Sequence, residues 1–306
     1  MLKPNKLANN NFLSSLDLST DEVLHILDLA NNFKNKKLNI DLGNKVLGLI
    51  FDKSSTRTRV SFQVAMTRLG GTTIDLNPTT SQIGRGEPIK DTARVLSRYC
   101  DVIAIRTFDH SNLEEYAKWS IKPVINALTD LEHPCQALAD FLTIHEEFLD
   151  FKDVVLTFIG DGNNVANSWI EAAALFGFEL RLVGPEAYHP SAELIAWALE
   201  KGANIIITKD AQEAARNASV LVTDVWVSMG DDKGTRVEDL KPFQVNQTLL
   251  DLAQPDALFL HCLPALRGQE VTAEVIDGPQ SVVFDEAENR LHAQKAIMAH
   301  IFKNYY

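Results

Sequence analysis

The sequence predicts an α/β fold with two doubly wound domains, each a parallel sheet flanked by helices. Short apolar runs of strand length alternate with stretches whose apolar residues recur at helical spacing, which is typical of a parallel sheet. Polar clusters follow the expected strands, and the carboxyl edge of a parallel sheet is where ligands bind. At 306 residues, the chain is long enough for two domains with separate cores.

Composition and charge limit the classes of function. Hydrophobic residues make up 45% of the chain and charged residues 23%, as in an ordinary soluble globular protein. The net charge of −12 argues against nucleic acid or an anionic membrane surface as a partner. No apolar run approaches the roughly 18 residues of a membrane span, and the N-terminus shows no secretory signal. Three scattered cysteines do not make a disulfide framework, so we expect a cytoplasmic protein.

The first half of the chain alternates expected helices and strands. Ser19 and Glu22 form a capping box that opens an amphipathic helix. Pro88 opens another helix, and Pro134 begins a helix that is expected to bridge the two domains. The polar loop at 77–87 is long enough to be functional or interfacial. Strands are expected at 46–51, 72–76, 101–105 and 122–125.

The second half continues this alternation and ends in a helix. Strands are expected at 153–159, 179–183, 204–207, 220–223, 257–261 and 281–284. We therefore place a first domain at 1–136, a second at 137–288, and a C-terminal helix at 289–306 that packs back on the first domain. Because polar clusters follow the strands of both sheets, we expect the active site in the cleft between the domains.

The strongest single motif lies where the first expected strand gives way to a helix. Ser55, Thr56, Arg57, Thr58 and Arg59 place three hydroxyls and two guanidinium groups at a helix N-terminus. Backbone N–H groups and the helix dipole favour an anion there, and arginine matches phosphate oxygens in a bidentate fork. The stretch lacks the features of a Walker loop. We interpret it as a phosphate cradle; the alternative is an ordinary capped helix with surface arginines.

A glycine-containing turn in the second half resembles only part of a dinucleotide fingerprint. Gly160 and Gly162 are in place, but Val165 stands where the third glycine belongs. We therefore expect no nicotinamide cofactor. Asn163 and Asn164 could simply serve the turn, because asparagine tolerates left-handed conformations.

Two further clusters in the second half are less specific. His261 and Cys262 have no second pair at metal-ligand spacing, so we expect no metal site and no cofactor. Cys262 alone would more often be a buried structural thiol than a nucleophile. Residues 224–230 turn polar abruptly after a strand, and Asp224 with an exposed Trp226 could bind a small molecule that has aliphatic and charged parts. The alternative for this stretch is a surface loop.

Taken together, these motifs resemble the aspartate/ornithine carbamoyltransferase family over almost the whole chain. The cradle and the His-Pro-Cys-Gln element at 133–136 are similar to the family in general. Asp-x-x-x-Ser-Met-Gly at 224–230 and His-Cys-Leu-Pro at 261–264 are similar to its ornithine-using members. Ser54 stands where many relatives have proline, which removes no donor. Further matching stretches lie at 51–59, 81–88, 91–94 and 289–290.

The resemblance implies transfer of a carbamoyl group from carbamoyl phosphate to the δ-amine of L-ornithine, giving citrulline and phosphate. Arg106, His133 and Thr58 would donate to the carbonyl oxygen, which gains charge in the transition state. Gln136 would hold the carbamoyl NH2. The implied carbamoyl-phosphate set is Ser55, Thr56, Arg57, Thr58, Gln82, Arg106, His133, Gln136, Cys262, Leu263 and Arg290.

The resemblance also implies an ornithine site. Asn164 and the Met229 N–H would hold the α-carboxylate, and Asp224 with Ser228 the α-ammonium. Cys262, together with Asp224, would steer the neutral δ-amine. The implied ornithine-binding set is Asn126, Leu128, Asn164, Asp224, Ser228 and Met229. Catalysis by positioning and electrostatics, without a covalent intermediate, would depend most on Arg106, His133, Gln136, Asp224, Cys262 and Arg290.

Two alternatives stay open. A carbamoyltransferase for aspartate, an N-acylated ornithine or putrescine would differ in residues 224–230. A non-catalytic phosphate- or amino-acid-binding module on the same fold would show no turnover. The polar loop at 77–87 and the resemblance together predict a homotrimer with shared active sites, in which Gln82 reaches the carbamoyl phosphate site of the neighbouring subunit.

Overall fold

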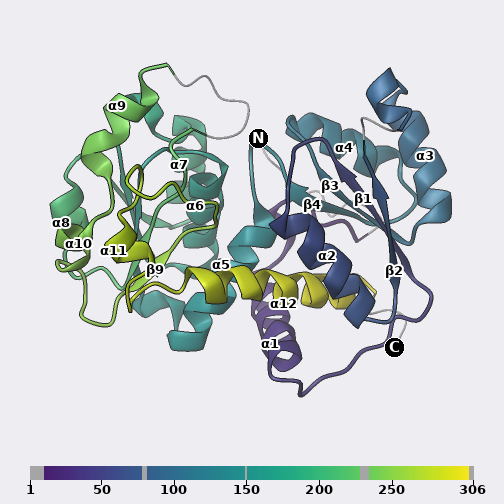
Figure 1. Ribbon diagram of the computed structural model, residues 1–306, viewed down its shortest axis with the longest axis horizontal. Coiled ribbons are helices and arrows are strands. Elements are labelled where there is room, and N and C mark those ends of the chain that lie inside the picture. Colours follow the sequence, from purple (N-terminus) through teal and green to yellow (C-terminus); the bar gives the residue numbers. More distant parts are fainter. Residues whose placement is uncertain (1–9, 78–80, 149, 228–233, 303–306) are drawn as a thin grey trace. The chain divides into compact units, whose positions relative to one another are not determined.

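The computed structural model describes residues 10–77, 81–148, 150–227 and 234–302, and the chain forms two compact units (Figure 1). The first unit comprises Met1–Leu142 and Asn289–Tyr306, and the second comprises Thr143–Glu288. The divisions fall within two helices, α5 (Pro134–Glu147) and α12 (Val283–Ile301). Each unit contains a parallel sheet with helices around it, so the predicted α/β fold is confirmed.

The sheet of the first unit has four parallel strands in the order β2-β1-β3-β4. The predicted capping box opens its first helix: Ser19 Oγ accepts the Glu22 N–H at 3.3 Å, and the Glu22 carboxylate accepts the Ser19 N–H at 3.0 Å. The strands are β1 (Val46–Phe51), β2 (Thr72–Leu76), β3 (Val102–Arg106) and β4 (Val124–Leu128). The helices are α1 (Thr20–Lys34), α2 (Arg57–Arg68), α3 (Ile89–Tyr99) and α4 (His110–Trp119).

The sheet of the second unit has five parallel strands in the order β7-β6-β5-β8-β9. These strands are β5 (Val155–Ile159), β6 (Glu179–Val183), β7 (Asn204–Thr208), β8 (Val220–Val222) and β9 (Leu258–Leu260). The helices are α6 (Asn164–Phe176), α7 (Ala192–Glu200), α8 (Ala211–Ala215), α9 (Arg236–Leu240), α10 (Gln247–Leu250) and α11 (Ala273–Ile276). Short 3-10 turns span Ser15–Asp17, Ile83–Arg85, Phe151–Asp153, Glu186–Tyr188 and Lys241–Phe243.

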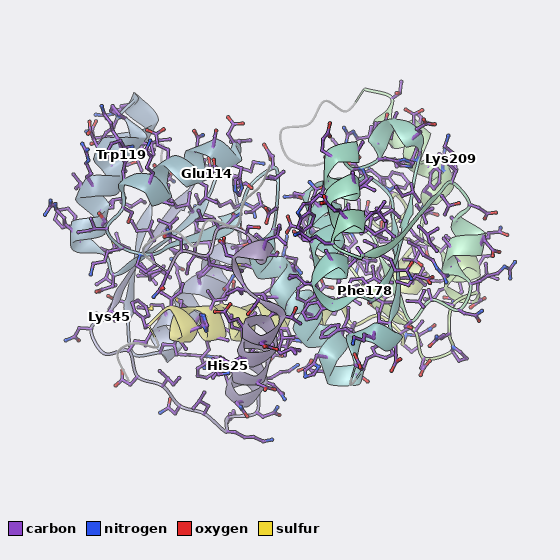
Figure 2. All side chains as sticks on the ribbon, turned by 180° about the vertical axis from the view of Figure 1, so that it is seen from behind. His25, Lys45, Glu114, Trp119, Phe178 and Lys209 are labelled. Carbon is purple, nitrogen blue, oxygen red and sulfur yellow. The ribbon has the colours of Figure 1, made fainter. Side chains whose placement is uncertain are left out.

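The sheets are held by apolar cores. In the second unit, the buried rings of Trp169 and Phe178 meet edge to face with centroids 6.2 Å apart. Lys209 lies on the exterior (Figure 2) and pairs with Glu186 at 3.1 Å, where an ion pair contributes little to stability. No helix in the described part of the chain has the length and apolar character needed to cross a membrane.

The strand register brings polar segments together at one edge of each sheet. In the first unit, Arg106 pairs with Phe51 on one side and with Leu128 on the other. In the second unit, Val222 lies between Phe158 and Leu260. The segments that follow these strands therefore start side by side at the carboxyl edge, as predicted.

Two expectations about secondary structure are wrong. The strand expected at 281–284 is absent: Ser281 makes a single bridge to Phe259, and Val283 already begins α12. Acidic residues in the first turn of α12 suit the positive end of a helix, which apolar periodicity alone did not reveal. The strand expected at 122–125 is shifted, so Asn126 and Leu128 lie within β4 rather than after it.

Candidate active site

A basic cluster forms at the carboxyl edge of the first sheet from Arg57, Thr58, Arg106, His133 and Arg290. Arg57 and Thr58 open α2, Arg106 ends β3, His133 precedes α5, and Arg290 lies in α12. Arg290 Nη2 donates to Thr58 Oγ1. Arg57, Arg106 and Arg290 all lie near enough for their charges to act on the His133 imidazole. The sequence-predicted residues thus gather three cations, a hydroxyl and an imidazole, a set that suits a phosphate-bearing ligand.

The start of α2 differs from an ordinary capped helix. No side chain caps its first turn, although Thr56 occupies the N-cap position. By contrast, α1 and α7 are capped by Ser19 and Ser191. The first-turn N–H groups of α2 are therefore not used by a side-chain cap, which favours the phosphate cradle over the capped-helix alternative.

His133 is buried and neutral at pH 7. Burial, and then the positive charges of Arg290, Arg106 and Arg57, hold the pKa of His133 well below its ordinary value. A neutral imidazole keeps one N–H donor and adds no positive charge to a site that already contains three arginines. His133 can therefore donate to a polarised carbonyl oxygen without first losing a proton.

The lowered pKa of His133 predicts how stability depends on pH. Above about pH 6.5, the imidazole is neutral in both the folded and unfolded states and contributes no slope. Below that pH, His133 binds a proton in the unfolded chain but not in the folded protein. The free energy of unfolding therefore falls by at most about 1.4 kcal/mol for each unit by which the pH is lowered. His133→Asn should lose this contribution. Urea unfolding of both proteins between pH 7.5 and 5.0 measures it, and a constant difference would contradict the assignment.

Gln136 is oriented by a carboxylate in the same helix. Gln136 Nε2 donates to Asp140 Oδ1 at 2.7 Å, and both side chains are buried. Because a carboxylate only accepts hydrogen bonds, this contact directs the amide oxygen of Gln136 away from Asp140. Gln136 can thus present an acceptor, as binding of a carbamoyl NH2 requires. Asp140 was not predicted from the sequence, although it lies one helical turn after Gln136.

The remaining candidate site residues of the first unit are less buried. Ser55 is half-buried, while Thr56 and Gln82 are exposed. Lys53, in contrast, is a buried cation that was not predicted as a site residue. It pairs with Asp130 and lies 4.4 Å from the centre of the Phe108 ring. These two contacts of the Lys53 ammonium group hold the segment that precedes the phosphate cradle.

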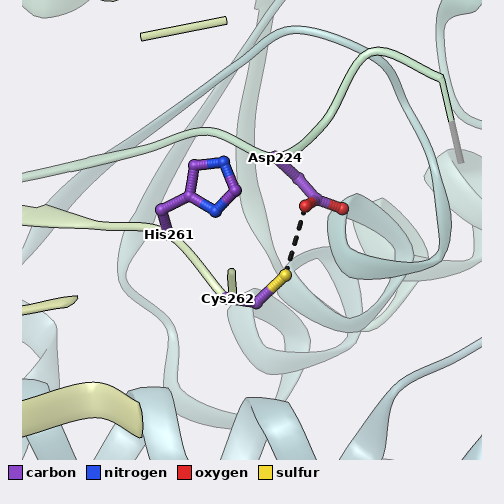
Figure 3. Close-up of side chains that lie close together, drawn as sticks. All are labelled: Asp224, His261 and Cys262. Carbon is purple, nitrogen blue, oxygen red and sulfur yellow. Dashed lines mark hydrogen bonds between the residues drawn. The ribbon is translucent and has the colours of Figure 1, made fainter. Parts of the chain in front are cut away.

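A second cluster, the acid–thiol cluster, forms at the carboxyl edge of the second sheet from Asn163, Asp224, His261 and Cys262. Cys262 Sγ donates to Asp224 Oδ1 at 3.1 Å (Figure 3). Asn163 Nδ2 donates to the other oxygen, Asp224 Oδ2, at 2.7 Å. Asp224 is buried, so its charge is stabilised by these directed donors. The cluster offers a carboxylate and a thiol to a ligand that carries amino groups.

His261 orients the backbone of the cluster. Its Nδ1 accepts the Leu263 N–H at 3.0 Å, and its Nε2 contacts Glu270 Oε1 at 3.1 Å. The first contact needs a lone pair on Nδ1, so Nε2 carries the proton that Glu270 accepts. The hydrogen bond from the Leu263 N–H to Nδ1 holds the Leu263 backbone in the left-handed region, at φ +58°.

The donor set does not fit a metal ion. Ligand atoms of Asp224, His261 and Cys262 lie within 4.8 Å of one another. Both ring nitrogens of His261 are engaged in the hydrogen bonds to Leu263 and Glu270, so neither can ligate without breaking one.

Trp226, expected to be exposed, is buried, with 1% of its surface accessible. Its ring packs beside Gly160, where an added Cβ would lie 3.6 Å from the indole. Asn164 begins α6 and is half-buried. Ser228 and Met229 lie outside the described residues.

The turn at Gly160 and Gly162 has a packing explanation. A Cβ on Gly162 would lie 2.4 Å from Pro190 Cδ and 2.5 Å from the Tyr188 carbonyl oxygen, so only glycine fits. Asn163 caps α6. Asn126, meanwhile, lies in the first unit, where its Nδ2 donates to the Leu13 carbonyl at 2.8 Å.

Comparison with known proteins identifies the family. The carbamoyl-P binding domain of aspartate/ornithine carbamoyltransferases matches residues 10–146, and their Asp/Orn binding domain matches residues 152–301. The chain belongs to the aspartate/ornithine carbamoyltransferase family. The basic cluster lies mainly in the part matched by the first domain, and the acid–thiol cluster lies in the part matched by the second.

Individual members of the family are similar over nearly their full length. An ornithine carbamoyltransferase of Prochlorococcus marinus (strain MIT 9312) is 68% identical over 304 residues, covering 98% of this chain and 99% of the relative. The solved structure of the Pyrococcus furiosus ornithine carbamoyltransferase has a TM-score of 0.90 at 48% identity, covering 96% and 97% of the two chains. The anabolic enzyme of Campylobacter jejuni has a TM-score of 0.91 at 38% identity, covering 96% and 99%.

Proposed function

We propose that this chain is an ornithine carbamoyltransferase, which transfers the carbamoyl group of carbamoyl phosphate to the δ-amine of L-ornithine and releases citrulline and phosphate. The observation that carries the proposal is neutral His133 with Arg57 and Arg106 inside the matched carbamoyl-P binding domain, joined by Arg290, which bonds to Thr58. The choice of ornithine is supported by the similar enzymes and by Asp224, a carboxylate suited to an ammonium group.

The first unit is proposed to hold carbamoyl phosphate. Arg57, Arg106 and the first turn of α2 would bind the phosphate, together with the hydroxyls of Ser55, Thr56 and Thr58. His133, Arg106 and Thr58 would donate to the carbonyl oxygen, while Gln136 would accept from the carbamoyl NH2. Arg290, already bonded to Thr58, would add charge at the same group. Roles for Leu263 and Cys262 toward this substrate stay predictions from the sequence.

The second unit is proposed to hold ornithine. Asp224 would take the α-ammonium and Asn164 the α-carboxylate, while Cys262 would direct the δ-amine. Ser228 and Met229 are proposed to complete this set, with Asn126 and Leu128 from the first unit.

The proposed reaction needs no covalent enzyme intermediate. The neutral δ-amine attacks the carbonyl carbon, an N–C bond forms, and the oxygen gains negative charge that His133 and Arg106 stabilise. The C–O bond to phosphate then breaks, phosphate leaves with the bonding electrons, and the new nitrogen loses a proton. The protein supplies position and charge.

The proposed function is tested by turnover with a panel of amines. The purified protein with carbamoyl phosphate should form citrulline from ornithine at a far higher kcat/KM than any product from N-acetylornithine, putrescine or aspartate. A preference for another amine would identify a different carbamoyltransferase. No turnover with any of them would favour a binding module.

We also propose a homotrimer with shared sites, in a cytoplasmic protein of arginine biosynthesis. Cys100, Cys135 and Cys262 are thiols, which supports the location. Exposed Gln82, at the start of the Ile83–Arg85 turn, would act in a neighbouring subunit.

Shared sites predict complementation between two inactive variants. Arg57→Ala and Gln82→Ala each damage every site, but mixed rings contain sites with both residues intact. For equal random mixing, about a quarter of the sites should recover in a closed heterologous ring. The measurement is citrulline formation after the variants are dissociated and reassociated together, compared with each alone. No gain with mixed trimers present would place Gln82 in its own subunit or outside the site.

A further inference from the structure

Asn163 uses both ends of its side chain. Its Oδ1 accepts the N–H groups of Val165 at 2.9 Å and Ala166 at 3.3 Å, capping α6. Its Nδ2 donates to Asp224 Oδ2 at 2.7 Å. An amide oxygen accepts and an amide NH2 donates, so the two contacts together fix which way the side chain faces.

Capping alone does not explain the choice of asparagine. Serine, aspartate and asparagine cap helices about equally well. In the same unit, Ser191 caps α7 and Asp210 caps α8. A serine hydroxyl is too short to reach both contacts, and aspartate has no N–H to donate to Asp224. Only asparagine combines the cap with a donor to the carboxylate.

The bond from Asn163 gives the Asp224 carboxylate a defined orientation. Asp224 follows β8, and its side chain is held from two neighbouring segments: Oδ2 by Asn163 at the start of α6, and Oδ1 by Cys262 after β9. Each carboxylate oxygen has a second lone pair, so both can still accept from a ligand. Two directed donors thus fix the plane of the carboxylate and the direction of its remaining lone pairs.

We propose that Asn163 is a positioning residue for the amine substrate: it anchors Asp224 to the rigid N-terminus of α6 so that the carboxylate faces the substrate's ammonium group. This inference rests on the proposed function, in which Asp224 binds that group. Asn163 itself need not touch the substrate. It acts through Asp224, so its loss should weaken amine binding selectively.

The test compares Asn163→Ser with Asn246→Ser. Serine keeps a cap in both variants, and Asn246 provides the matched control because it caps α10 through the Leu249 N–H. Asn163→Ser should raise KM for ornithine about 10- to 100-fold, the effect of one lost bond to a charged group. KM for carbamoyl phosphate and the melting temperature should match those of Asn246→Ser. An unchanged ornithine KM, or equal rises in both KM values, would overturn the proposal.

Two further variants separate positioning from general damage. Asn163→Asp keeps the helix cap but places a second carboxylate beside that of Asp224. This variant should therefore impair ornithine use more than Asn163→Ser. In an Asp224→Asn background, Asn163→Ser should add less than about a twofold further loss, because residues that act as one unit are not additive. Full additivity would show that Asn163 does not act through Asp224.

A crystal structure of Asn163→Ser gives a readout that does not depend on the substrate. The first turn of α6 should persist while the Asp224 carboxylate rotates or becomes disordered. An unmoved carboxylate would overturn the positioning role whatever the activity. If the wild-type protein makes no citrulline, the proposed function fails, and the orientation of Asp224 still decides this inference.

Discussion

Replacing Arg57 with alanine is expected to lower kcat/KM for carbamoyl phosphate by about 100-fold or more. A lost hydrogen bond to a charged group costs about 1.5–3 kcal/mol, and an arginine in a phosphate site makes two such bonds. Arg57 opens α2, so its loss also removes charge from the end of the helix where the anion would sit. Steady-state kinetics with each substrate varied in turn measure the effect, which should be concentrated in carbamoyl phosphate.

Arg59→Ala is the matched control for this substitution. Arg59 lies two residues further along α2, but it pairs with Asp75 at 3.3 Å and lies 5.2 Å from the centre of the Phe51 ring. It should have a small effect on carbamoyl phosphate use. Equal losses in the two variants would indicate damage to α2 rather than a lost phosphate contact.

Arg57→Ala has a second readout that does not require turnover. The charge of Arg57 helps to lower the pKa of His133, behind burial and the charges of Arg290 and Arg106. Without Arg57, the pKa of His133 should rise toward its ordinary value while remaining below it. NMR titration of the imidazole would follow this change. An unchanged titration would mean that Arg57 does not face His133.

The fold was predictable because the apolar patterns of the strands and helices and the polar clusters after the strands indicate the same α/β architecture. Most expected strands lie where the apolar runs placed them, and the capping box at Ser19 is present. The basic cluster was predictable too, because hydroxyls and arginines at a strand-to-helix turn have few structural uses. The helix that carries Arg290 was expected, but its start at Val283 was not predictable, since the short apolar run of Val282, Val283 and Phe284 fits a strand or a helix equally well.

Side-chain partners were the least predictable part. Sequence indicated that Asn163 could serve a turn, but its bond to Asp224 spans 61 residues and depends on the adjacency of β5 and β8. The pairs Gln136–Asp140 and His261–Glu270 have short spacings, yet only the structure shows which atoms meet. Burial of Trp226 likewise depends on tertiary packing around its ring, which no periodicity encodes.

Asp224→Asn is expected to lower kcat/KM for ornithine by about 100-fold or more, because it removes the negative charge proposed to face the α-ammonium. The substitution keeps the size of the side chain, and the new amide oxygen can still accept from Asn163 Nδ2. The fold and the use of carbamoyl phosphate should therefore be kept. Asp239→Asn is the control, since Asp239 also accepts two hydrogen bonds, from Tyr188 and Thr235, each at 2.7 Å.

A comparison of two amines isolates the contact that Asp224 makes. N-acetylornithine carries the same δ-amine as ornithine but no positive charge on the α-nitrogen, so the Asp224 carboxylate has no α-ammonium to bind. Asp224→Asn should therefore spare whatever slow use the protein makes of N-acetylornithine, and the preference for ornithine should fall about as steeply as kcat/KM for ornithine itself. Equal losses for the two amines would instead place Asp224 at the δ-amine, next to Cys262, because that group is common to both substrates.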